Sequence, residues 1–90
     1  MSIKIKIHKT HRQYTNGLSV VEVSGNTVGD CLDDLVKRFP DMKKGIFNQK
    51  DKLLHVVDIY INKDSAYPNE LAKPVSDGDE IFLTLLLAGG

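Results

Sequence analysis

The first apolar and polar positions of the chain alternate in the manner of a half-buried β-strand. Residues 3–7 read IKIKI, with an isoleucine at every second position and a lysine between. Because successive side chains of a strand point to opposite faces, this pattern predicts one apolar and one charged face. Asn16-Gly17 is a dipeptide that tolerates the positive φ angles of a tight hairpin turn. The β-branched run LSVVEV, residues 18–23, then predicts the second strand of a hairpin.

The next segment carries a helical pattern. Its apolar side chains recur at spacings of three and four residues, and they are Val28, Cys31, Leu32, Leu35, Val36 and Phe39. Thr27 precedes them as the predicted N-cap, and Asp30 as the acidic partner of a capping box. Pro40 predicts the end of the helix, because a proline disfavours helical geometry in the residue before it.

The second half of the chain reads as loops and two further strands. Residues 41–52, DMKKGIFNQKDK, are mostly polar and predict a loop or a short irregular turn. Residues 53–62, LLHVVDIYIN, alternate from Val57 onward and predict a third strand. Residues 63–75 contain two prolines and predict loop, followed by a turn in SDGDE. The last strand, IFLTLLL at residues 81–87, is nearly continuous in its hydrophobicity, which is typical of a central strand covered on both faces.

The order strand, strand, helix, strand, strand predicts an α+β fold of the β-grasp (ubiquitin-like) arrangement. We expect a mixed sheet of four to five strands with one main helix packed across one face, joined by a right-handed crossover. A length of 90 residues fits a single domain. We expect this domain to span residues 1–86, followed by a flexible Gly-Gly tail over residues 87–90.

Charge and hydropathy exclude several classes of partner. Lys and Arg number 12, as do Asp and Glu, and no basic stripe is interleaved with aromatic residues, so we expect no nucleic-acid partner. The longest apolar run falls well short of the ~20 residues that cross a bilayer. The first residues alternate charge and isoleucine, unlike a signal peptide. We therefore expect a cytoplasmic protein with no membrane partner.

No residue set in the chain forms a self-contained catalytic or metal site. His8 and His11, three apart on the predicted first strand, point to opposite faces, and no cysteine pair or carboxylate cluster joins them, so we expect no metal site. The single cysteine, Cys31, lies on the apolar stripe of the helix and is interpreted as a core residue, although a thiolate near a helix N-terminus is a candidate nucleophile. We expect no catalytic residue, no bound cofactor and no enzymatic activity of the chain's own.

The last strand runs directly into Leu87, Ala88, Gly89 and Gly90. Without a Cβ, Gly89 and Gly90 can enter a channel too narrow for other residues, and four extended residues reach about 13–14 Å. A carboxylate there can attack the α-phosphorus of ATP within a partner's active site, forming an acyl-adenylate. Sulfide or a persulfide can then displace AMP and leave a thiocarboxylate. Two alternatives are a ubiquitin-like modifier joined to lysines of target proteins, and a non-covalent interaction module whose tail has no role.

Several motifs resemble the MoaD/ThiS family of ubiquitin-like sulfur carriers over nearly the whole chain. They are SGNTVGDCLDDLVKRFP at residues 24–40, LLHVVDIYIN at 53–62, DGDEI at 77–81 and the terminal AGG. The resemblance implies a ubiquitin-activating-type adenylating enzyme that uses ATP, with the thiocarboxylate on Gly90 and with Ala88 and Gly89 threaded into that enzyme. It also implies a downstream sulfur-accepting synthase, in cysteine or homocysteine, molybdopterin or thiamine synthesis.

Within the family, an insertion and the segment IYINKD, residues 59–64, resemble the longer, cysteine-biosynthesis-type carriers, and one dipeptide departs from the molybdopterin carriers. The chain has the insertion DMKKGIFNQKDKLLH at residues 41–55. It also has Leu85-Leu86 where molybdopterin carriers often have a Pro-Pro pair.

The register of the last strand decides which of its side chains a partner can reach. One alternating set is Ile81, Leu83 and Leu85, and the other is Phe82, Thr84 and Leu86. If the first set faces the helix, the second faces the other side of the sheet. We then expect Phe82, Leu86 and Leu87 to dock the partner enzyme, the alternative being that a loop covers them.

Overall fold

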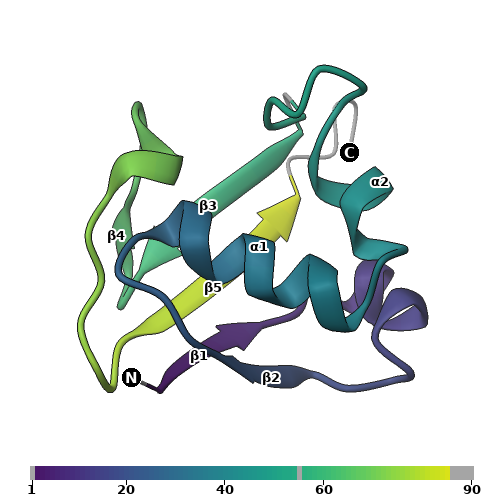
Figure 1. Cartoon of the computed structure of the whole chain (residues 1–90), viewed down its shortest axis with the longest axis horizontal. Coiled ribbons are helices and arrows are strands. Elements are labelled where there is room, and N and C mark those ends of the chain that lie inside the picture. Colours follow the sequence, from purple (N-terminus) through teal and green to yellow (C-terminus); the bar gives the residue numbers. More distant parts are fainter. Residues whose placement is uncertain (1, 55, 86–90) are drawn as a thin grey trace.

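The computed structural model describes residues 2–54 and 56–85, which form a five-stranded mixed sheet with helices on one side (Figure 1). The strands are β1 (Ile3–Lys6), β2 (Val20–Val23), β3 (Val57–Ile61), β4 (Asp64–Ser65) and β5 (Glu80–Leu85), in the order β2-β1-β5-β3-β4. The helices are α1 (Val28–Arg38) and α2 (Met42–Ile46), with 3-10 helices η1 (Lys9–Tyr14) and η2 (Glu70–Ala72). The predicted α+β class and β-grasp fold are confirmed. The predicted boundary between the domain and the tail lies outside the described residues.

The central strand of the sheet is β5, as its continuous hydrophobicity predicts. It pairs parallel with β1 and antiparallel with β3, while β2 and β4 form the edges. Ile81 and Leu83 point under α1, where they are 0% and 6% exposed. Alternate residues of the neighbouring strands join them in the core, including Ile3, Ile5, Val21, Val23, Val57 and Ile59.

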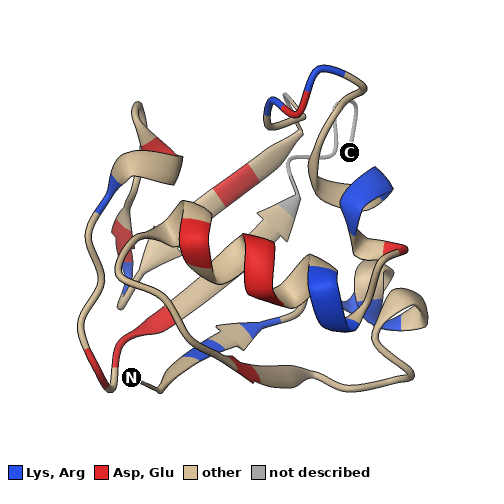
Figure 2. Cartoon of the chain, in the orientation of Figure 1, with Lys and Arg blue, Asp and Glu red and all other residues tan. Residues whose placement is uncertain are grey.

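Helix α1 covers this core with the apolar stripe that its sequence predicts. Val28, Cys31, Leu32 and Leu35 are buried, and Phe39 leaves helical geometry before Pro40. Figure 2 shows acidic residues on the first turns of α1 and basic residues on its last turn, an arrangement that complements the helix dipole. In the described residues, no helix is both long enough and apolar enough to cross a bilayer.

The predicted N-cap is confirmed, with one difference in the capping box. The Thr27 hydroxyl accepts a hydrogen bond from the Asp30 amide at 3.1 Å. The Asp30 carboxylate accepts from the Asn26 amide at 3.3 Å, one residue earlier than a standard capping box. Both ends of the capping interaction therefore fix the loop that enters α1.

The prediction of a loop over residues 41–52 is wrong for its first part, which forms α2. Met42 and Ile46, four residues apart, lie on one face of this short helix and are both buried. Burial of these two side chains stabilises a segment that is too short and too polar to show helical periodicity. The remaining residues form a tight turn in which the Asn48 side chain accepts from the amides of Lys50 and Lys52.

The predicted hairpin between the first two strands is also wrong in its connection. β1 and β2 pair antiparallel, and Asn16 and Gly17 have the predicted positive φ angles of 55° and 85°. However, η1 is inserted before this turn, so the link is far longer than a two-residue hairpin loop. The buried Thr15 hydroxyl donates a hydrogen bond to the Leu18 carbonyl oxygen at 2.9 Å and so closes the turn.

The segment between β3 and β5 is mainly loop, as predicted, but includes β4 and η2. The turn before β5 is confirmed, with Gly78 at a φ of 90°. The Asp79 carboxylate accepts from the Ser76 amide at 2.8 Å and from the Asn62 side-chain amide at 2.9 Å. These two hydrogen bonds, the one from Ser76 first, lower the pKa of Asp79.

Cys31 is a core residue, as its place on the apolar stripe predicts. Its side chain is fully buried, and burial raises the pKa of the thiol from 9.0 to about 11, with a smaller contribution from Asp30 and Asp34. The thiol therefore stays protonated at neutral pH and is not a nucleophile.

Replacing Thr27 with alanine should lower the free energy of unfolding by about 1 kcal/mol, because α1 loses its side-chain cap. For a domain of this size, that corresponds to a fall of roughly 4–8 °C in the midpoint of thermal unfolding followed by circular dichroism. Thr27→Ser keeps the hydroxyl and should stay close to the wild type. An equal loss in both variants would contradict the capping role.

The native protein should resist alkylation of Cys31 by iodoacetamide at pH 8. A pKa shift from 9.0 to about 11 leaves the thiolate fraction roughly a hundredfold below that of an ordinary cysteine, before any steric protection. Mass spectrometry should detect the adduct only after denaturation in guanidinium chloride, which serves as the positive control. Rapid labelling of the folded protein would show that the thiol is accessible.

Candidate functional site

The strand β5 presents two different surfaces. Because Ile81 and Leu83 are buried under α1, the alternating residues Phe82 and Thr84 lie on the opposite face of the sheet, where both are half-buried. Figure 1 is viewed from the helix side, so this face lies behind the sheet. The sequence alone did not decide which residues of the last strand face the helix. In the structure, Phe82 faces away from it.

The strand register aligns Phe82 with residues of three other strands. Lys6 of β1 is paired with both Val20 and Phe82, and Tyr60 of β3 is paired with Phe82 on its other side. These four side chains, which we call the Phe82 row, cross the helix-free face from β2 to β3. Val20 is 36% exposed. The row combines apolar and aromatic surface with one cation, a composition common in protein interfaces.

Polar and charged groups within the row interact with neighbours on the same face of the sheet. The Lys6 ammonium lies 5.7 Å from the centre of the Phe82 ring and 4.0 Å from the Glu80 carboxylate. On the other side, a hydrogen bond to Asp58 and the negative charge of that residue raise the pKa of Tyr60. A partner therefore meets an aromatic centre with a cation on one side and an anion on the other.

Of the residues that the sequence assigned to the site, Phe82 is the one the structure describes. Leu86, Leu87, Ala88, Gly89 and Gly90 lie outside the described residues. Lys6, Val20 and Tyr60 were not predicted, because their alignment with Phe82 depends on strand pairing between distant segments. The alternation of residues 3–7 placed Lys6 on the charged face, but it gave no information on its neighbours.

The prediction that His8 and His11 lie on a strand and point to opposite faces is wrong. His8 caps η1 and His11 lies within it, so the two rings are on one helical turn. The Thr10 hydroxyl oxygen lies 2.9 Å from His8 Nδ1 and 3.1 Å from His11 Nδ1, and His11 Nε2 lies 2.7 Å from the Gly45 carbonyl oxygen. His11 therefore connects η1 to α2, which is a structural role.

The metal-ligating side chains of the described residues do not gather. No group of three or more His, Cys, Asp or Glu residues within residues 2–54 and 56–85 is placed to hold a metal ion. One interaction surface that the described residues present is the Phe82 row, which crosses the middle of the sheet at β5, the strand that precedes residues 86–90.

Comparison with known proteins gives relatives over the whole chain. No protein-family model matches. The chain is 29% identical over 93 residues to the sulfur carrier protein CysO of Mycobacterium tuberculosis, and the match covers 100% of both chains.

Two solved structures are similar in both fold and sequence. One is the Amycolatopsis orientalis BexX/CysO complex, with a TM-score of 0.88, 28% identity, and coverage of 98% of this chain and 99% of that chain. The other is SAMP1 from Haloferax volcanii, with a TM-score of 0.87, 27% identity and 100% coverage of both.

Proposed function

We propose that the chain is a member of the MoaD/ThiS family of ubiquitin-like sulfur carriers, and that its Gly90 carboxylate is the group that carries the sulfur. Its function is that of a sulfur carrier rather than a catalyst. The match to CysO, which extends over 100% of both chains, is the observation that carries the proposal. With CysO as a relative, we assign the delivered sulfur to the synthesis of cysteine or a related amino acid.

The proposed chemistry takes place in a partner of the ubiquitin-activating type. The Gly90 carboxylate attacks the α-phosphorus of ATP, pyrophosphate leaves, and an acyl-adenylate forms. Sulfide then attacks the acyl carbon and AMP leaves with the electrons of the broken C–O bond, which gives the thiocarboxylate. A sulfur-accepting synthase is the second partner. ATP is a substrate of the adenylating enzyme, and this chain binds no cofactor of its own.

The position of β5 suits a carrier whose end is handled by another protein. Pairing with β1 holds the strand on one side as far as Phe82, and pairing with β3 holds it on the other side as far as Leu85, opposite Val57. From this fixed point, residues 86–90 span at most about 17 Å when extended. A partner that binds the sheet face therefore also fixes how far Gly90 can extend from the binding surface.

We propose that the partner binds the sheet face at the Phe82 row. Its aromatic centre supplies apolar contact area, and Lys6 and Glu80 beside it supply charges that favour one orientation. One of the similar solved structures, the BexX/CysO structure, is itself a complex of a carrier with another protein. Leu86 and Leu87 are still predicted to take part in this contact. The cytoplasm is still the predicted location of the protein.

Incubation with ATP, sulfide and an adenylating enzyme of the ubiquitin-activating type should convert the Gly90 carboxylate to a thiocarboxylate. Intact mass spectrometry would detect the exchange of one oxygen for one sulfur, and fragmentation would assign it to the last residue. A variant lacking Gly89 and Gly90 should fold normally and show no exchange. A variant with a single residue added after Gly90 should behave in the same way, because the Gly90 carboxyl is then part of an amide bond.

Two results would count against this function. One is an unchanged mass with every candidate adenylating enzyme, despite a folded chain. The other is sulfur-independent attachment of Gly90 to lysines, seen in digests of cell extract as isopeptide-linked peptides that end in Gly90, which would favour the modifier alternative.

Phe82→Ala should weaken binding to the adenylating enzyme by about tenfold or more, because the centre of the row loses its aromatic anchor. Isothermal titration calorimetry with the purified enzyme measures the change. Tyr67→Ala is the matched control, because Tyr67 is 73% exposed and lies outside the row. Equal affinities for the two variants would show that the enzyme binds elsewhere.

A further inference from the structure

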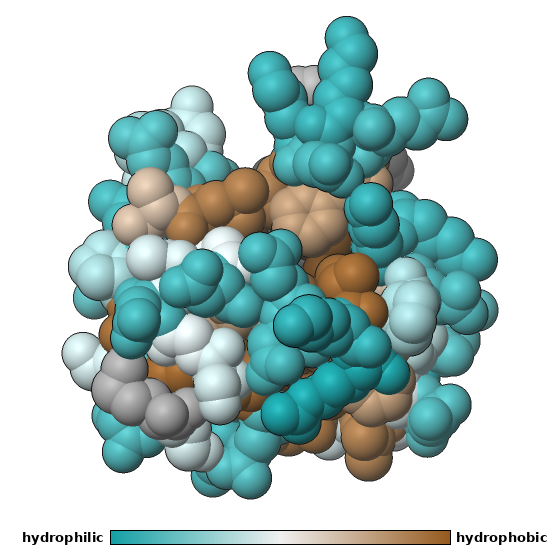
Figure 3. All heavy atoms as spheres, in the orientation of Figure 1, coloured by the Kyte–Doolittle hydropathy of each residue, from teal (hydrophilic) through white to brown (hydrophobic). Residues whose placement is uncertain are grey.

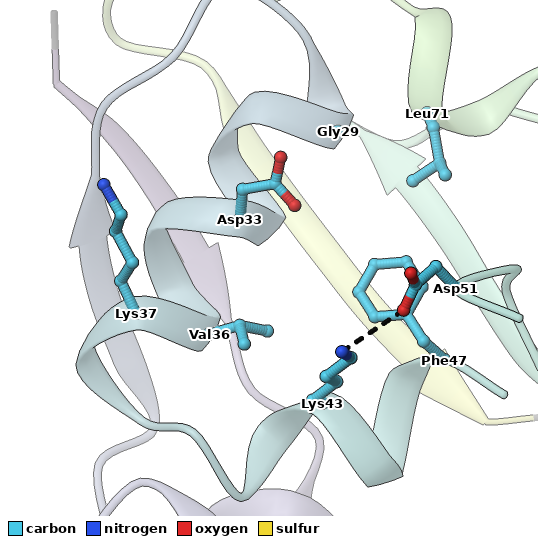
Figure 4. Close-up of a pocket in the computed structure, with 8 residues that line it drawn as sticks. All are labelled: Gly29, Asp33, Val36, Lys37, Lys43, Phe47, Asp51 and Leu71. Carbon is cyan, nitrogen blue, oxygen red and sulfur yellow. Dashed lines mark ion pairs between the residues drawn. The ribbon is translucent and has the colours of Figure 1, made fainter. Parts of the chain in front are cut away.

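A groove lies on the helix side of the molecule, on the opposite side of the core from the Phe82 row. Its volume is about 380 Å³. On one side it is bounded by α1, and on the other by the segment that follows α2 and by η2 (Figure 4). Its apolar lining consists of Val36, Phe47 and Leu71, all half-buried. Figure 3 shows apolar atoms at the surface in this region, above α1. We call this the helix-side groove.

The walls of the groove are held by backbone hydrogen bonds to neighbouring elements. On one side, the amide of Phe47 donates to the Lys43 carbonyl at 2.8 Å, and the amide of Leu54 donates to the Ile46 carbonyl at 2.9 Å. On the other side, the amide of Val28 donates to the Lys73 carbonyl at 2.9 Å. A groove with fixed walls is preformed, so a ligand would not have to order it.

The close approach of α1 and η2 depends on a glycine. A Cβ at Gly29 would lie 3.0 Å from the Leu71 carbonyl oxygen and 3.4 Å from the Leu71 Cβ. Gly29 therefore lets η2 pack directly on α1 and close one end of the groove.

The charges around the groove leave one carboxylate without a counterion. The Lys43 ammonium and the Asp51 carboxylate lie 3.2 Å apart and neutralise each other. Lys37 also lines the groove and makes no ion pair within the described residues, but in Figure 4 its side chain points away from the groove, whereas the Asp33 carboxylate points toward it. Within the described part of the chain, Asp33 makes no ion pair and no side-chain hydrogen bond. The groove thus combines an apolar floor with one unpaired negative charge at its rim.

We propose that the helix-side groove docks a second protein partner, through an aliphatic or aromatic side chain flanked by a lysine or arginine about one helical turn away. The apolar side chain would pack between Val36, Phe47 and Leu71, and the cation would pair with Asp33. This proposal does not depend on the chemistry of Gly90. Since α1 and the core separate the groove from the Phe82 row, the chain can hold this partner while an enzyme occupies the sheet face.

Selection of a phage-displayed library of random 12-residue peptides against the full-length chain tests the proposal. Enriched peptides should share an apolar residue and a basic residue three or four positions apart. When such a synthetic peptide is titrated into labelled protein, the amide shifts in two-dimensional NMR spectra should map to Val36, Phe47 and Leu71. No enrichment, an acidic consensus, or shifts confined to the Phe82 row would overturn the proposal.

Matched variants separate a contact in the groove from a general effect on the fold. Val36→Ala should weaken peptide binding about fivefold, and Asp33→Asn about threefold, whereas Val56→Ala and Asp64→Asn on other surfaces should leave it unchanged. A double-mutant cycle of Asp33→Asn with replacement of the peptide's basic residue by glutamine should be non-additive. Additive effects, or equal losses in the control variants, would show that Asp33 does not pair with the peptide's cation.

Discussion

The pairing of β5 with β1 on one side and β3 on the other is the constraint on which the rest of the structure depends. Because side chains alternate along a strand, this pairing places Ile81 and Leu83 under α1 and Phe82 on the opposite face. A slip of one residue would expose the first two and bury the third, at the cost of much of the core. Burial of aliphatic side chains thus determines which aromatic side chain the sheet presents to a partner.

A sulfur carrier needs this kind of constraint more than it needs reactive groups. Among the described residues, Cys31 is buried and protonated, and His11 joins η1 to α2, so both have structural roles. What the body supplies is a rigid strand beside a surface that another protein can recognise. The residue that we propose to carry the sulfur, Gly90, therefore needs no reactive side chain, provided that its distance from the docking surface is fixed.

The parts of the fold that were predicted correctly are those set by local patterns. The stripe and N-cap of α1, the alternation in β1 and β3 and the turn at Gly78 can each be read within a few residues. The helix α2 was missed because it depends on burial of Met42 and Ile46 by distant segments. The histidines were misplaced for the same reason, since η1 is held by a contact from His11 to the Gly45 carbonyl, 34 residues away. The Phe82 row required strand pairings that no single segment contains.

The two surfaces of the molecule have separate structural origins, which bears on how carriers of this kind differ in their partners. The Phe82 row follows from the register of the sheet, so altering it would disturb the core as well. The apolar lining of the helix-side groove comes from Val36 of α1, Phe47 and Leu71, and these side chains are only half-buried. Substitutions there would change the shape and charge of the groove at little cost in stability. The sheet face can therefore stay matched to one enzyme while the helix face is adapted to another protein.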